Sequence, residues 1–143
     1  MYSAAHKAVD AYARVGVETG VAAADPHKLI LMLYDGSQAA IAKARSAMSH
    51  GDIPAKGAAI SKAIEIIDLG LKASLDVKAG GVLAERLSAL YDYMLNRLLA
   101  ANLRNDVAIL DEIARLLNEL RGAWAQIGQA GTASATAGEA TSK

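Results

Sequence analysis

Large apolar side chains recur every three or four residues in four segments of the chain, and short breaks separate these segments. Each segment is roughly 22–25 residues long, which corresponds to a helix of about 35 Å. Nowhere do apolar and polar residues alternate with a period of two, so no β-strand is expected. Short connections between helices of matched length favour antiparallel neighbours. The sequence therefore predicts an all-α fold, namely an antiparallel up-down-up-down four-helix bundle.

Residues that start and stop helices set the predicted boundaries. The pair Asp25-Pro26 predicts a helix start, because aspartate caps free amide groups and proline fits the first helical turn. The pair Gly80-Gly81 predicts a break further along. With these and similar signals, the predicted helices cover about residues 26–49, 53–75, 82–102 and 106–127.

The two ends of the chain differ from the helical segments. Residues 1–24 form an N-terminal leader segment, which lacks the apolar core of a secretory signal. Residues 128–143 carry almost no large side chain, so they cannot offset their ordering entropy and a disordered C-terminal tail is expected. A single domain over residues 1–127 remains. Its apolar run from Leu29 to Leu33 is far shorter than the ~20 residues of a membrane span, so no membrane insertion is expected.

Charge and residue types exclude several functions. Lysine plus arginine number 15 and aspartate plus glutamate number 15, so charge gives no reason to expect binding to nucleic acid or to an anionic membrane. The chain has no cysteine, which excludes disulfides and thiolate chemistry. None of His6, His27 and His50 follows a glutamate by three residues, as the metal ligands of di-iron bundles do. We therefore expect no catalytic residue, no cofactor and no metal, and hence no enzyme.

Two predicted helices have apolar faces wider than the arc of roughly 100° that a bundle core needs. The surplus positions are Ile66, Leu69 and Ala73 on the second helix and Tyr91, Leu95 and Leu99 on the third. One explanation is that the wide faces cover a large core or the leader. The other is an outer groove that receives an amphipathic helix or an extended peptide. The residues alone leave both explanations open.

Short motifs along the chain are similar to those of a known protein family. In order they read DPHKLILMLYDG from Asp25, KG from Lys56, KAIEII from Lys62, SLD from Ser74, GG from Gly80, LYDYM from Leu90, ANLRND from Ala101 and LRGAW from Leu120. With this order and spacing, the chain resembles the FliS family of flagellar export chaperones from about Tyr12 to Ile127.

The resemblance implies a cytoplasmic export chaperone without enzymatic activity. Such a protein would bind the disordered C-terminal segment of flagellin and prevent its premature polymerisation. It would also support delivery of flagellin to the flagellar type III export apparatus, whose gate components would be further partners. Two other classes stay open as alternatives, namely a helical module with weak self-association through the same groove and a helical-bundle enzyme.

The expected flagellin-binding residues line grooves beside the second, third and fourth helices. They are Ile60, Ile64, Ile67, Leu71, Tyr91, Leu95, Leu98 and Asn102. Asn102 would hold backbone of the partner, although an asparagine at this place is equally suited to end its own helix.

The leader has a short apolar face of its own. Tyr2, Ala5, Val9 and Tyr12 recur at spacings of three and four residues. A free helix this short is marginal, so an ordered leader must be docked on the bundle. We expect it to cover part of the groove in the free chaperone, with Tyr12 as its anchor. The alternative is a leader that permanently seals one end of the core.

Overall fold

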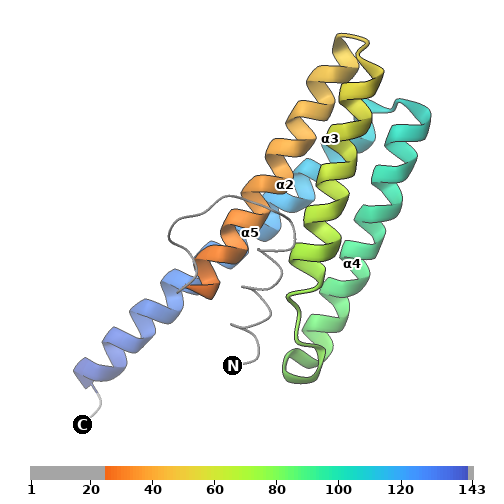
Figure 1. The fold of residues 1–143 in the computed structure, drawn as a ribbon. Coiled ribbons are helices and arrows are strands. Elements are labelled where there is room, and N and C mark those ends of the chain that lie inside the picture. Colours follow the sequence, from red (N-terminus) through yellow and green to blue (C-terminus); the bar gives the residue numbers. More distant parts are fainter. Residues whose placement is uncertain (1–24, 142–143) are drawn as a thin grey trace.

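The computed structural model describes the backbone of residues 25–141 and the side chains of residues 25–127. Its elements are α2 (Pro26–Ser49), α3 (Ile53–Glu65), the π-helix η2 (Ile66–Lys72), α4 (Val77–Arg104) and α5 (Val107–Thr141). Figure 1 shows the chain running up α2, down α3 and η2, up α4 and down α5. No strand occurs in the described part. The fold is therefore the predicted all-α antiparallel bundle, and the leader lies outside the described residues.

Aspartate side chains cap the starts of α2, α3, α4 and α5. The carboxylate of Asp25 accepts a hydrogen bond from the amide of Lys28 at 3.2 Å. Asp52 does the same for the amide of Ala55 at the start of α3. Each cap satisfies an amide that has no partner within its own helix.

The start of α4 differs from the prediction. The helix begins at Val77 instead of near residue 82, because Asp76 caps it through the amide of Ala79 at 3.2 Å. The predicted glycine break is nevertheless present as a kink, since Gly81 has a φ of 58° and a ψ of −135°. Glycine adopts a positive φ without steric cost. One short helical turn therefore precedes the main body of α4.

The last helix also differs from its predicted boundary. α5 continues past residue 127 to Thr141. Alanine is the best helix former, and extending an existing helix avoids the cost of nucleation. The helix therefore does not end where the apolar stripe ends. The disorder expected for residues 128–143 stays a prediction, and residues 142–143 lie outside the described residues.

All four helical segments contribute side chains to one core. The largest fully buried side chains include Leu29, Leu33 and Ile41 of α2, Ile60 and Ile67 of α3 and η2, Met94 and Leu98 of α4, and Leu110, Ile113 and Leu117 of α5. No side-chain nitrogen or oxygen buried in the described part lacks a hydrogen-bond partner. The bundle is thus closed by its own side chains.

The π-helix η2 explains one of the two wide apolar faces. A π-helix has more residues per turn than an α-helix, so its apolar stripe shifts around the axis. As a result, the adjacent residues Ile66 and Ile67 are both buried, as are Gly70 and Leu71. Ile66 therefore belongs to the core and not to an outer groove. Leu69, also in the surplus line, is 37% exposed.

Candidate functional site

The expected binding residues all lie where α3 and η2 pack against α4, but most of them are inside the protein. Ile60, Ile67, Leu71, Tyr91 and Leu98 are each at most 2% exposed. In this structure these positions form the inner stripe that closes the core, and their contact with flagellin stays a prediction. Ile64, Leu95 and Asn102 are half-buried and reach the surface.

Two polar links fasten α3 and η2 to α4. The ammonium of Lys56 donates hydrogen bonds to the carbonyl oxygen of Asn102 at 2.9 Å and to Oδ1 of Asn105 at 3.1 Å. Further along, Lys72 forms an ion pair with Asp92 at 2.7 Å. Because the helices are antiparallel, the middle of α3 lies across from the stretch of α4 between these links.

Five apolar side chains on this stretch of α3 and α4 are partly or largely exposed to solvent, and we call them the outer apolar row. Its members are Ile53 and Ile64 of α3 and Leu95, Leu99 and Leu103 of α4. Leu99 is 58% and Leu103 is 87% exposed. The three leucines are four residues apart and therefore lie on one side of the helix.

The sequence missed part of this row. Leu99 is one of the surplus positions but not one of the expected binding residues, and Ile53 and Leu103 belong to neither set. The four-residue spacing of Leu95, Leu99 and Leu103 was the available signal. It could not show how far each side chain protrudes.

The structure also settles the end of α4. Asn105 and not Asn102 adopts the left-handed conformation that ends the helix, with a φ of 55°. The carbonyl oxygen of Asn102 accepts the hydrogen bond from Lys56. Asn102 therefore does not end its own helix, and its half-buried side chain lies beside the outer apolar row.

A pocket of about 520 Å³ opens at the end of the bundle where α2 begins and α4 is kinked. We call it the end pocket. Its walls include Ile30, Leu71, Leu75, Leu83, Leu87 and Trp124, with Tyr34 and Tyr91 also lining it. Two of the expected binding residues, Leu71 and Tyr91, thus line a pocket although they are buried.

The side chains of Tyr34 and Tyr91, which line the end pocket, contact each other through their hydroxyl groups. Oη of Tyr34 and Oη of Tyr91 are 2.6 Å apart and share one hydrogen bond. Burial raises the pKa of both phenols above the usual value, most strongly for Tyr91, because an ionised phenolate would lose its hydration. Both tyrosines therefore keep their protons at neutral pH.

His27 and Trp124 fasten the rim of the end pocket. Nε2–H of His27 donates to the carbonyl oxygen of Trp124 at 2.7 Å, and Nε1–H of Trp124 donates to the carbonyl oxygen of His27 at 3.0 Å. The two rings are stacked, with centroids 4.9 Å apart. This reciprocal contact holds the first turn of α2 against α5.

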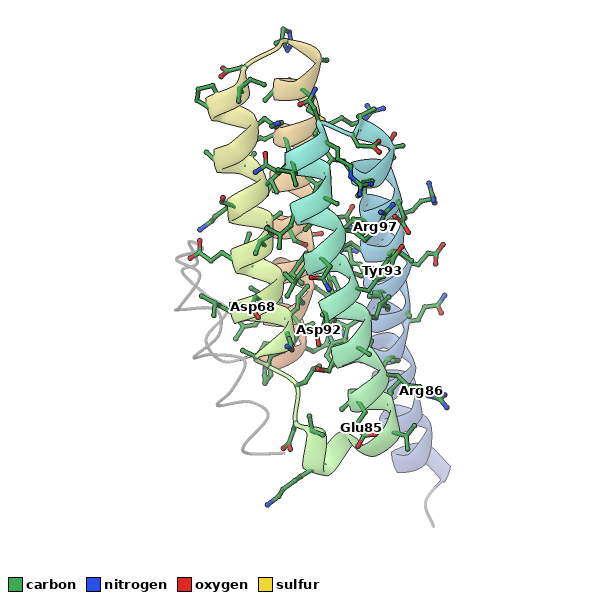
Figure 2. The ribbon with its side chains drawn as sticks, turned by 90° about the vertical axis from the view of Figure 1, so that its right-hand side faces the viewer. Asp68, Glu85, Arg86, Asp92, Tyr93 and Arg97 are labelled. Atoms are coloured by element: carbon green, nitrogen blue, oxygen red, sulfur yellow. The ribbon has the colours of Figure 1, made fainter. Side chains whose placement is uncertain are left out.

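On the side of α4 that faces α5, the side chains form polar contacts. The hydroxyl of Tyr93 donates to a carboxylate oxygen of Glu112, and Arg97 donates to the other oxygen at 3.2 Å. Figure 2 shows Tyr93 and Arg97 on the side of α4 that faces α5, whereas Asp92 lies toward Asp68 of η2. The hydrogen bond from Tyr93, with that from Arg97, lowers the pKa of Glu112. These polar contacts join α4 to α5.

The described residues hold no group of histidines, cysteines and carboxylates that could bind a metal ion. None of the described helices is long and apolar enough to cross a membrane.

Comparison with known proteins gives a consistent match over most of the chain. The model of a family described as "Flagellar protein FliS" matches residues 8–131. The flagellar secretion chaperone FliS of Salmonella typhimurium is 53% identical over 127 residues, which cover 89% of this chain and 93% of that protein. The flagellar secretion chaperone FliSB of Pseudomonas aeruginosa is 46% identical, over 84% of this chain and 94% of that protein. The flagellar secretion chaperone FliS of Escherichia coli is 44% identical, over 87% of this chain and 90% of that protein.

Proposed function

The chain belongs to the FliS family of flagellar secretion chaperones, and from this premise we propose that it binds the C-terminal segment of flagellin in the cytoplasm. Its role is that of a chaperone and not of an enzyme. While the chaperone occupies the segment, flagellin cannot use it to pair with other subunits. Premature polymerisation is thereby prevented, and flagellin stays available for delivery to the gate of the type III export apparatus.

The outer apolar row is the observation that carries this proposal. The bundle closes its core without Leu99 and Leu103, so their exposure serves no purpose in the isolated fold. Large exposed apolar side chains gathered on neighbouring helices favour an interaction site. An amphipathic helix of the partner, with apolar side chains at three- and four-residue spacing, would match the row.

The expected binding residues take different parts in this proposal. Ile64, Leu95 and Asn102 would contact flagellin directly, because they reach the surface beside Leu99 and Leu103. The buried residues Ile60, Ile67, Leu71, Tyr91 and Leu98 support that surface from beneath.

Binding would be coupled to folding of the flagellin segment. A segment that is disordered when free orders as it buries its apolar side chains, and this ordering consumes part of the interaction energy. The resulting affinity is moderate for the area buried. Moderate affinity favours release of flagellin at the export gate.

The leader would regulate access to the outer apolar row. We propose that it covers part of this surface in the free chaperone through Tyr12, and that flagellin displaces it. Tyr12 lies outside the described residues, so the support is the apolar spacing of the leader and the exposed surface that it would shield.

Calorimetric titration with a peptide of the last ~40 residues of the host flagellin tests the proposed function. We expect a one-to-one complex, a negative heat-capacity change and a gain of helical circular dichroism on mixing. No binding at micromolar concentrations, or binding that requires the N-terminal half of flagellin, would contradict the proposal. Size-exclusion chromatography without the peptide tests the alternative of weak self-association.

A further inference from the structure

The hydroxyl groups of Tyr34 and Tyr91 carry one more proton than their mutual hydrogen bond uses. Each phenol has one proton, and the 2.6 Å contact between the two oxygens uses one of the two. The second proton has no acceptor among the described residues, although the two side chains are only 4% and 2% exposed. Each oxygen has the other as its partner, but one hydroxyl proton is left over, so the pair would gain a hydrogen bond from a ligand that supplies an acceptor.

The surroundings of the pair decide which acceptor fits. Tyr34 and Tyr91 both line the end pocket, whose other walls are mainly aliphatic and aromatic. The pocket residues include no lysine or arginine, and their only carboxylate, Asp76, caps α4. A carboxylate ligand would therefore enter without a cation to balance its charge, which is costly in an apolar pocket. A neutral oxygen on an apolar group meets no such penalty.

The end pocket and the outer apolar row lie along the same helix. The pocket includes Leu83, Leu87 and Tyr91 of α4, and the row begins at Leu95 and ends at Leu103. Together they extend over about 30 Å of helix. One extended partner segment can therefore occupy the row and place a side chain or a carbonyl group in the pocket.

We propose that the Tyr34–Tyr91 hydroxyl pair donates a hydrogen bond to a neutral oxygen of the flagellin segment, an amide or hydroxyl oxygen carried by an apolar stretch that fills the end pocket. The pair would thus determine which residue of the partner is accepted at this place, and an acidic residue would be rejected. This inference rests on the proposed function for the identity of its ligand.

Two small ligands of matched shape test, in the absence of flagellin, whether the Tyr34–Tyr91 pair donates a hydrogen bond. Acetophenone and α-methylstyrene have nearly the same shape, but only acetophenone carries a carbonyl oxygen. Their dissociation constants are measured by NMR on the full chain, from the signal of the Trp124 indole at the pocket wall. Dividing the affinity ratio in the natural chain by the ratio in a variant cancels the different hydration of the two ligands.

The test variant is the double substitution Tyr34→Phe with Tyr91→Phe. It removes both hydroxyl groups and leaves an apolar floor, a change that is close to neutral for folding when both partners go together. Tyr93→Phe is the matched control, because it removes a hydroxyl from the same helix on the side facing Glu112. The thermal unfolding of all three proteins is compared first.

We expect the preference for acetophenone to fall about tenfold in the double variant and to be unchanged in Tyr93→Phe. The same double variant should bind the flagellin peptide about tenfold more weakly. An unchanged ligand preference would overturn the proposal. So would an increase of acetophenone affinity in the free chain on Tyr12→Phe, because the leader would then be the natural occupant. The natural chain could also prefer acetophenone over α-methylstyrene and yet fail to bind the flagellin peptide. In that case the proposed function is wrong, but the Tyr34–Tyr91 pair is still a hydrogen-bond donor to a neutral oxygen.

Discussion

The ammonium group of Lys56 lies 2.9 Å from the carbonyl oxygen of Asn102, near the end of α4, where helical carbonyl groups have no partner within the helix. The same ammonium donates to Asn105, which ends the helix. Only 5% of Lys56 is exposed, so a charged side chain is buried in order to serve these acceptors. The start of α3 and the end of α4 are thereby held together, next to Ile53 and Leu103 of the outer apolar row.

Replacing this lysine should destabilise the bundle. Lys56→Met keeps the apolar stem but removes the donor of both hydrogen bonds, which costs about 1–3 kcal/mol in the free energy of unfolding. Urea denaturation followed by circular dichroism measures the loss. Lys43→Met, at an exposed position of α2, is the control and should change stability by less than about 0.5 kcal/mol. Equal effects of the two substitutions would show that the Lys56 contacts contribute nothing.

Two adjacent leucines of α4 should separate binding from folding. Leu99→Asp changes a residue that is 58% exposed, so the bundle should stay folded while affinity for the flagellin peptide falls at least about tenfold. Leu98→Asp buries a charge without a partner and should unfold the protein. Circular dichroism and calorimetry measure the two effects. A folded Leu99→Asp variant with unchanged affinity would remove Leu99 from the proposed contact surface.

The fold could be predicted from the sequence because its signals are local. Apolar periodicity gives the helices, and the pair Asp25-Pro26 marks where the first of them starts. Each of these signals depends on residues that are close together in the sequence, so it can be interpreted without knowing how the helices pack.

The candidate site could not be predicted to the same extent. The π-helix shifts the buried stripe of the second helix, so that Ile66 joins Ile67 in the core. A constant α-helical period cannot anticipate that shift. Periodicity also assigns a face but not a degree of exposure, and for this reason the buried Leu98 was expected at a surface to which its neighbour Leu99 belongs.

Two glycines should respond to alanine in opposite directions. Gly36 lies inside α2, and an added Cβ would meet Cδ1 of Ile66 at 3.5 Å, an ordinary van der Waals distance. Gly36→Ala should therefore stabilise the protein by about 0.5–1 kcal/mol through higher helix propensity. Gly81→Ala should destabilise it by about 1 kcal/mol or more, because the φ of 58° disfavours a side chain. Thermal melts of both variants show whether stability rises or falls. A lower melting temperature for Gly36→Ala would contradict the prediction for that position.

Glu112 should contribute to the acid side of the stability profile. Its pKa is lowered in the folded protein by the hydrogen bond from Tyr93 and by Arg97. A carboxyl group with a lowered pKa stabilises the fold above its unfolded pKa of about 4.3, and this contribution is lost as the pH falls through the folded value. Glu112→Gln should flatten the decline of stability below about pH 5. Urea titrations between pH 3 and pH 7 measure the free energy of unfolding of both proteins. If it falls in parallel for the natural chain and Glu112→Gln, Glu112 does not make this contribution.

Removal of the leader decides between a cover and a seal. A cover competes with flagellin for the same surface, so deletion of residues 1–18 should raise the affinity for the flagellin peptide, because more of the chaperone is then competent to bind. The free protein should also bind more apolar dye or dimerise, since apolar surface is uncovered. A seal contributes only stability, so deletion would lower the melting temperature without raising affinity. Calorimetry and thermal melts on the same truncated protein measure both quantities, and an affinity that falls together with stability would end the cover hypothesis.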